Sequence, residues 1–448
     1  NVFVHIAEAL FTLSPEGEVV PLLATGYEVS LDGLEWTIHL RQGVTFHDGT
    51  PFNARAAKFN LDRFRTKARF KFLVAAIQNV EEVGDYTIKL YLDKPFAPLL
   101  RGLAHTFTGM LSPTAIEAGK GEPIGTGPFK FVEWVRGHRL VLTRNPNYWG
   151  DGPYLDKLIF KPVPEPGTRV MMLLAGEADV ITVLPPDDVP VVEADPATVV
   201  VRVPSLTIQY LGFNNQRGPF KDARVRRAIN YAVDKEEIVK YIQGGFAKVA
   251  DAPIGPAVFG YHPAGPYPYD PEEARRLLAA AGYPDGFKTT LRFNPGWREA
   301  AAELIQAQLR KVGIEVELIP MEWGAYLAFT ARPVAENTVD MFLLGWITVT
   351  MDADYGLYGT LHTSQWSPGT NRALYSNPRV DELLDKARVT LDPEARKAMY
   401  AEAIELIWAD APWCFLFVPE WVRGERVGVR GVVHHPNGQA LAHLAWKE

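Results

Sequence analysis

The stretch TVDMFLLGWITVTMDADY, residues 338–355, joins a continuous apolar run to a polar segment. Its first half, 338–347, lacks the alternation of polar and apolar residues, which is typical of a strand buried on both faces of a parallel or mixed sheet. Helices must cover both faces of such a sheet, so the stretch favours an α/β protein. The polar half contains hydroxyls and carboxylates that are either ligand groups or ordinary turn and cap chemistry: Thr348, Thr350, Asp352 and Asp354.

Helices alternate with strands on both sides of this stretch. Upstream, a predicted helix over 299–311 leads into a strand over 314–320. Downstream, Asn377 and Asp392 each precede a proline, which is a frequent beginning of a helix. Residues 414–427 have the composition of a late pair of strands. Further predicted helix caps are Asp222, Asp234 and Asp270. The pattern predicts an α/β fold in at least two lobes.

The N-terminal part of the chain alternates in the manner of strands. A turn at Asp32–Gly33 separates two half-apolar runs, and Asn53 is positioned to cap the helix that follows. Further strands are predicted over 80–93 and 129–144. Residues 251–270 are rich in Pro and Gly and too long for an ordinary connection, which indicates a crossing between domains together with an extended surface loop.

The bulk composition is that of a globular protein with more than one domain. The chain has 448 residues, of which 47% are hydrophobic and 22% charged, and this length exceeds one ordinary core. A net charge of −7 without a Lys/Arg block argues against nucleic-acid binding. No apolar run approaches the roughly 18 residues that a membrane helix needs. The chain starts at Asn1 without a Met or a leader, so we expect any export signal to lie upstream.

Motifs for catalysis or cofactor binding are not apparent in the sequence. It contains no HExxH, Walker or G-x-S-x-G pattern, and the GTG at 125–127 is too short to indicate a phosphate loop. Cys414, the only cysteine, leaves no thiol metal site and is interpreted as a small buried hydrophobe. The adjacent His434 and His435 would face opposite sides of a strand. We therefore expect no cofactor and no metal, and a peptidase built on the two carboxylates of the opening stretch is the weaker hypothesis.

Several long segments then appear in a recognisable order: LRQGVTFHDGTPFNA, PIGTGPFKFVEW, RNPNYWG, TRVMMLLAGEADV, PFKDARVRRAINYAVDKEEIV and YPYDPEEARRLLAAAGYPDGF. Together they resemble the family 5 solute-binding proteins of ABC importers, which include dipeptide, oligopeptide, nickel, haem and glutathione receptors. The resemblance covers nearly the whole chain. GWITVTMDADYGLYGTLHTSQW, RALYSNPRVDELL and IELIWADAPW are similar to the glutathione-binding branch, whereas MEWGAYL is similar to the dipeptide receptors.

The resemblance implies an α/β, two-lobed periplasmic binding protein fold (class II, cluster C type) with an extra inserted domain. Discontinuous domain I maps to 1–10, 150–250 and 426–448, the family-specific insertion, domain II, to 10–150, and domain III, the second ligand lobe, to 251–425. Relative to the family, the chain lacks the opening strand and the leader. The implied protein is a periplasmic or extracytoplasmic monomer, with or without a lipid anchor, that closes on a small peptide-like ligand and delivers it to an ABC permease.

The resemblance also assigns ligand groups. In dipeptide and oligopeptide receptors, an Asp three residues after the matching Trp pairs with the α-ammonium of the ligand, and the same count from Trp346 gives Val349. An apolar side chain cannot compensate a buried ammonium, so an ordinary dipeptide held by its N-terminus is not expected. Arg292 lies one residue from the carboxylate-binding Arg of dipeptide receptors, and Arg101 and His105 lie in a segment that lines the cleft of related receptors.

The candidate ligand set is thus Trp346, Thr348, Val349, Thr350, Asp352, Asp354, Arg292, Arg101, His105 and Trp366. Tryptophans beside turns suit a binding cleft or the core, and besides Trp346 and Trp366 these are Trp297 and Trp323. The leading hypothesis is a receptor for a short peptide-like anion, with glutathione favoured. The alternatives are a dipeptide or oligopeptide receptor and a receptor for a metal chelate or haem.

Overall fold

The computed structural model describes residues 2–66 and 68–448, and these divide into two compact units. Unit 1 consists of Asn1–Val203, Val389–Leu391 and Trp421–Glu448, and unit 2 of Pro204–Arg388 and Asp392–Glu420. The proline- and glycine-rich residues 251–270 lie within unit 2. The three-domain division that the resemblance implies stays a prediction.

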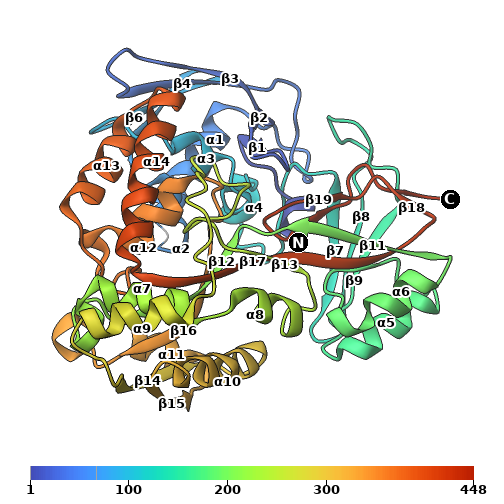
Figure 1. Cartoon of the computed structure of the whole chain (residues 1–448). Helices are drawn as coiled ribbons and strands as arrows, with labels where there is room; N and C mark the ends of the chain where they lie inside the picture. Colours follow the sequence, from blue (N-terminus) through green and yellow to red (C-terminus); the bar gives the residue numbers. More distant parts are fainter. Residues whose placement is uncertain (1, 67) are drawn as a thin grey trace. The chain divides into compact units, whose positions relative to one another are not determined.

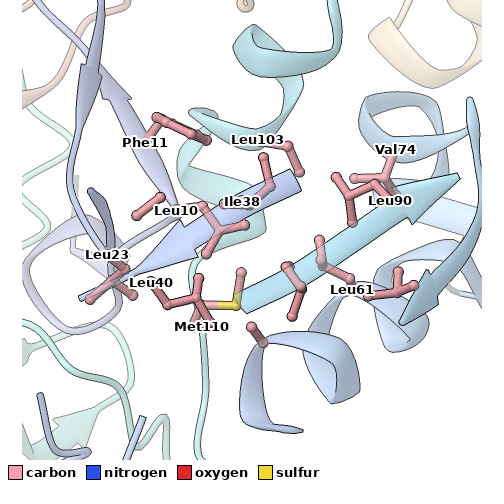
Figure 2. Packing of buried hydrophobic residues seen from close by; sticks show 14 of the residues in the cluster. Leu10, Phe11, Leu23, Ile38, Leu40, Leu61, Val74, Leu90, Leu103 and Met110 are labelled. Atoms are coloured by element: carbon pink, nitrogen blue, oxygen red, sulfur yellow. The ribbon is translucent and has the colours of Figure 1, made fainter. Parts of the chain in front are cut away.

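The core of unit 1 is built on a four-stranded antiparallel sheet of order β3-β4-β6-β5, made of β3 (Ala24–Val29), β4 (Glu35–Leu40), β6 (Thr87–Leu92) and β5 (Ile77–Gly84). The predicted turn is present, with Gly33 at φ 71°. The predicted cap of α1 (Ala54–Thr66) is also confirmed, because Asn53 Oδ1 accepts a hydrogen bond from the Ala56 amide at 3.1 Å. Figure 2 shows how Ile38, Leu90 and Leu61 pack in one apolar cluster with the segment around Leu10.

Smaller elements complete unit 1. The strands are β1 (Phe11–Leu13), β2 (Val19–Pro21), β7 (Phe129–Val135), β8 (Arg139–Arg144), β9 (Lys157–Phe160), β10 (Val180–Ile181), β11 (Thr198–Pro204), β18 (Val429–Arg430), β19 (Val433–His434), β20 (Ala440–Leu441) and β21 (Trp446–Lys447). The helices are α2 (Ala68–Val74), α3 (Leu99–Leu103), α4 (Pro113–Glu117), α5 (Pro166–Leu174) and α6 (Val189–Ala194). Here β7, β8 and β9 form a second antiparallel sheet.

Unit 2 contains a mixed sheet of order β17-β12-β16-β14-β15, with β13 paired to β17. Its strands are β12 (Thr207–Phe213), β13 (Ala247–Val249), β14 (Phe287–Phe293), β15 (Ile314–Pro320), β16 (Met341–Ile347) and β17 (Trp413–Arg426). The apolar half of the opening stretch is β16, which runs antiparallel to β12 and parallel to β14. The predicted buried strand in a mixed sheet is therefore confirmed.

One expectation about this sheet is wrong. Residues 413–426 form the single strand β17 and not a pair of strands. Its first half pairs with β12 and β13, and near its other end Gly424 and Glu425 pair with β10. The strand is continuous through Pro419, whose carbonyl accepts a hydrogen bond from the Ser205 amide at 3.0 Å.

The helices of unit 2 are α7 (Ala223–Ala232), α8 (Lys235–Tyr241), α9 (Pro271–Ala280), α10 (Trp297–Arg310), α11 (Trp323–Thr330), α12 (Gly359–Leu361), α13 (Pro378–Val389) and α14 (Pro393–Asp410) (Figure 1). All four aspartates expected to cap helices do so. Their side chains accept the amides of Arg224, Glu237, Glu273 and Ala395 at the starts of α7, α8, α9 and α14. The helix α10 connects the parallel strands β14 and β15.

The two faces of the unit 2 sheet differ in character. One face carries Leu211, Leu343 and the buried Cys414 in a core with residues of α7, α9 and α10. The other, called the aromatic face below, consists of Ile208, Tyr210, Phe342, Trp346 and Trp413. There, Tyr210 stacks on Trp413 at 3.9 Å between ring centroids. A Cβ at Gly212 would lie 2.3 Å from the Phe342 ring, so only glycine leaves room for that ring. The aromatic face ends at the polar half of the opening stretch.

Candidate functional site

The loop that follows β16 turns sharply and buries two threonines. The Thr348 amide donates to the Leu206 carbonyl at 3.1 Å, and the Met351 amide donates to the Thr348 carbonyl at 2.9 Å. Met351 has φ 54°, a left-handed conformation that is unusual for a non-glycine residue. Thr348 and Thr350 are buried, and neither hydroxyl has a hydrogen-bond partner within the part of the chain that the structure describes. These hydroxyls remain available to a ligand or to water.

Trp346 lies at the end of the aromatic face. Its ring stacks on Tyr355 with centroids 5.3 Å apart, and Gly359 lies against the ring edge, where a Cβ would be 3.8 Å from it. Its buried Nε1–H finds no acceptor among the described residues. Val349, three residues on, is partly exposed, and its amide donates to the Ile347 carbonyl at 2.9 Å.

Asp352 is completely buried, and its negative charge is matched by an arginine. Its Oδ1 accepts from Arg396 Nη2 at 2.8 Å and from the Asp354 amide at 2.9 Å. Arg396 also donates to the Tyr400 hydroxyl and to the Ala387 carbonyl, each at 3.0 Å. Burial by itself lowers the pKa of Arg396, but the Asp352 carboxylate raises it above the ordinary value. Arg396 therefore stays charged inside unit 2.

Asp354, also buried, pairs with Arg388 at 2.9 Å. Burial raises the pKa of Asp354 to about 6; Arg388 opposes this shift, whereas the nearby Asp352 adds to it. The Arg388 guanidinium in turn lies 3.8 Å from the centre of the Tyr358 ring. Both carboxylates thus have internal arginine partners, and Asp352 also accepts a turn-type hydrogen bond from the Asp354 amide. A direct ligand role for either carboxylate stays a prediction.

Arg292 and Trp366 also have internal partners. Arg292 donates to Thr290 Oγ1 at 2.9 Å and lies 4.6 Å from the centre of the Phe329 ring. Burial lowers the pKa of Arg292, and Asp340 acts against that shift. Arg292 in β14 pairs with Phe342 in β16, so its side chain belongs to the same face of the sheet as Phe342, the aromatic face. Trp366 uses its Nε1–H to donate to the Tyr375 carbonyl at 2.6 Å.

The remaining two candidates belong to unit 1. Arg101 lies in α3 and is partly exposed. His105 caps the turn that follows, because its Nδ1 accepts from the Phe107 amide at 3.1 Å. Burial lowers the pKa of His105 to about 4, so the imidazole is neutral at physiological pH. The other eight candidates all belong to unit 2, where the six from the opening stretch are brought together.

Two arginines that the sequence did not single out stand out in the structure. Arg298 is the second residue of α10, and Arg372 follows the loop at Thr370. Neither has an ion-pair partner within the described residues. In the sequence, Arg298 is notable only because it follows Trp297 near the start of a predicted helix. Arg372 is the first residue of RALYSNPRVDELL, the segment that served to compare this chain with the glutathione-binding branch of the family. Neither signal distinguishes a ligand arginine from a solvated one.

The described residues contain no group of three or more His, Cys, Asp or Glu side chains suited to a metal ion. Within the same part of the chain, no helix is long and apolar enough to cross a membrane.

Comparison with known proteins agrees with this architecture. The family model for "Bacterial extracellular solute-binding proteins, family 5 Middle" matches residues 18–368. The glutathione-binding protein GsiB of Pectobacterium atrosepticum is 37% identical over 424 residues, which cover 91% of this chain and 82% of that protein. Two solved structures are similar over nearly their whole length. HbpA2 from Haemophilus parasuis has a TM-score of 0.90 at 30% identity and covers 100% of this chain and 94% of its own. DppA from Helicobacter pylori, solved with the peptide STSA, has a TM-score of 0.82 at 33% identity. The match covers 99% of this chain and 92% of DppA.

The fold and these similarities define the class: the protein is an α/β solute-binding protein with the periplasmic binding fold, and not an enzyme. More particularly, the chain belongs to family 5 of the bacterial extracellular solute-binding proteins, the receptors of ABC importers. The predicted family and fold class are confirmed.

Proposed function

We propose that this chain captures a short peptide-like solute, glutathione in the first place, and delivers it to the permease of an ABC importer. The similarity to proteins named as glutathione-binding over 91% of the chain supports the ligand class. The observation that carries the proposal is the group of unpartnered donors at the end of the aromatic face: Trp346 Nε1, Thr348 Oγ1 and Thr350 Oγ1. A buried polar group without a partner is costly, and a bound peptide-like backbone would supply carbonyl and amide partners.

Val349 favours glutathione over an ordinary dipeptide. The position that carries an ammonium-binding Asp in dipeptide receptors has no carboxylate here, and the next two acids, Asp352 and Asp354, are already paired with arginines. An α-ammonium placed at Val349 would be buried without a counter-ion, which is strongly unfavourable. The ammonium of glutathione belongs to its γ-linked end and can therefore occupy a different place.

A dipeptide or oligopeptide receptor is the second candidate. This candidate is favoured by the similarity to DppA from Helicobacter pylori. That protein is 33% identical to this chain, and its structure contains a bound peptide. Under this hypothesis, Asp352 or Asp354 would exchange its arginine partner for the ligand's ammonium.

The mechanism that we propose is a population shift. A ligand that binds the closed form of a two-lobed receptor better than the open form stabilises closure, and closure signals the permease. No covalent chemistry is needed. We also propose that the protein is a monomer and is located in the periplasm or outside the cytoplasm, with or without a lipid anchor.

Thermal unfolding with added ligands tests the proposal. Reduced glutathione, oxidised glutathione and a plain dipeptide are compared at equal concentrations, and a ligand at 100 times its Kd adds about 2.7 kcal/mol to the stability. A rise in Tm with either glutathione form and none with the dipeptide is expected. A rise with the dipeptide alone would replace glutathione by the second candidate. An absorbance scan of the untreated protein covers the alternative of a haem or metal-chelate receptor, because bound glutathione gives no visible band.

A further inference from the structure

Around the aromatic face of unit 2, the positive charges of arginines exceed the negative charges of acids. The two acids of the opening stretch are each matched by an arginine, Asp352 by Arg396 and Asp354 by Arg388. These two pairs contribute no net charge. Arg298 and Arg372, by contrast, have no acidic partner in the described part of the chain. The neighbourhood therefore carries a surplus of positive charge.

Arg298 is partly buried without compensation. Its guanidinium lies 4.8 Å from the ring centre of Trp297 and 6.0 Å from that of Trp323. Its Nε is buried and has no hydrogen-bond acceptor among the described residues. Burial lowers the pKa of Arg298, and the groups that oppose this are the phenols of Tyr326 and Tyr210, not carboxylates. Contacts with aromatic rings attract the cation but leave its hydrogen-bond donors unused.

Arg372 has neutral partners only. Its Nη1 donates to the Leu327 carbonyl at 3.0 Å and to Thr330 Oγ1 at 3.1 Å. Burial lowers its pKa too, and again the opposing groups are the phenols of Tyr210 and Tyr326. Leu327, Thr330 and Trp323, which lies 6.0 Å from the Arg298 guanidinium, all belong to α11. Both arginines therefore adjoin the same helix, which places them in one neighbourhood.

That neighbourhood adjoins the aromatic face. Tyr210 belongs to this face. The Tyr326 hydroxyl donates to the Leu343 carbonyl of β16 at 2.5 Å. The strand β16 then leads to Trp346 and its unpartnered Nε1–H. Cationic donors and an unpartnered neutral donor thus both border the aromatic face.

We infer that Arg298 and Arg372 bind the carboxylates of the ligand and restrict this receptor to peptide-like solutes with more carboxylates than ammonium groups. This inference rests on the proposed function and specifies its ligand class. A guanidinium matches a planar carboxylate with two parallel hydrogen bonds, and such charge-assisted bonds are the strong ones in a partly buried site. Because the nearby acids are already neutralised, a ligand without net negative charge would leave the surplus uncompensated. Glutathione, with two carboxylates and one ammonium, meets the condition.

Calorimetric titration of the full chain tests the inference. The probes are reduced glutathione, its diethyl ester, in which both carboxylates are blocked, and trialanine, a zwitterion. The variants are Arg298→Gln and Arg372→Gln. Arg332→Gln is the matched control, since Arg332 is an exposed arginine of the same unit that also lies over an aromatic ring, 4.4 Å from the centre of Phe329.

The wild-type chain is expected to bind glutathione at least about tenfold more tightly than the ester, a difference of about 1.4 kcal/mol. Each of the two variants should weaken glutathione binding by about tenfold or more and leave the ester unchanged, whereas Arg332→Gln should change neither. Tight glutathione binding that survives both substitutions would overturn the inference and leave the proposed function standing. Binding of trialanine but not glutathione by the wild type would overturn both the glutathione proposal and the charge rule. Binding of an acidic peptide such as acetyl-aspartyl-glutamate, lost in both variants, would support the charge rule even if glutathione failed.

Discussion

Two charged regions of unit 2 follow opposite rules. In the loop after β16, Asp352 and Asp354 look in the sequence like free ligand groups, yet each has an arginine within 2.9 Å. Beside the aromatic face, Arg298 and Arg372 look in the sequence like ordinary solvated arginines, yet neither has an acid. A charge that is matched inside the protein contributes to structure, whereas a desolvated charge without a match is available to a ligand. The residue type alone does not distinguish the two cases.

The largest expected effect concerns the matched charges. Arg396→Gln leaves the fully buried Asp352 without its arginine, and removal of one partner of a buried pair costs about 3–5 kcal/mol. Chemical unfolding, followed by a signal from unit 2, measures the loss. Arg379→Gln is the control, because Arg379 forms only exposed ion pairs, with Glu382 and Glu402, and should change stability little. A loss for Arg396→Gln as small as that of the control would show that the Asp352 pair is not structural.

The second prediction concerns pH. Because the pKa of Asp354 is raised from 3.8 to about 6, the native state binds more protons than the unfolded state between these values. The contribution of Asp354 to stability is therefore complete below about pH 4 and is lost as pH rises through about 6. Relative to Asp354→Asn, the wild type should gain about 2.4 kcal/mol between pH 7 and pH 4.

Unfolding free energies of both proteins at several pH values check this difference. Asp32→Asn serves as the control of opposite sign, since hydrogen bonds from Ser30 and the Leu34 amide lower the pKa of Asp32. A difference between wild type and Asp354→Asn that is independent of pH would contradict the buried, partly neutralised state of Asp354.

The third prediction converts the ligand preference. Val349→Asp restores a carboxylate at the ammonium position of dipeptide receptors, where Asp352 and Asp354 are held by their own arginines. Affinity for a plain dipeptide should rise by about tenfold, or about 1.4 kcal/mol. Calorimetry with the dipeptide measures the gain, and Val349→Asn, which has nearly the same shape without the charge, should show none. An equal gain in both variants would mean that the charge at this position is irrelevant.

The smallest effect is expected for the unmatched charges in the absence of ligand. Arg298→Met removes a partly buried guanidinium that no carboxylate compensates and keeps an apolar chain of similar length. Stability should therefore stay within about 1 kcal/mol of the wild type or increase. Chemical unfolding of the ligand-free protein measures the change. A loss comparable to that of Arg396→Gln would show that Arg298 has a structural partner and would end the contrast between the two regions.

Much of the local structure could be predicted from the sequence. The caps at Asp222, Asp234, Asp270 and Asp392 were predictable because a side-chain oxygen reaches an amide only two or three residues away. The character of β16 was predictable because burial on both faces requires an unbroken apolar run. By contrast, the segment of β17 was expected to form a pair of strands, since no local rule shows that β10, β12 and β13 pair with one continuous strand in turn.

The sequence by itself determined the α/β class, the capped starts of four helices, the family and the absence of an acid at position 349, because each depends on periodicity, on near neighbours or on residue order. Only the tertiary structure decided which charges are matched. Arg396 lies 44 positions from Asp352, and Arg298 and Arg372 contact residues of the same helix, α11, from distant segments. The physical reason is that a buried charge depends on every group within a few ångströms, and folding brings those groups together from positions that local pattern does not relate.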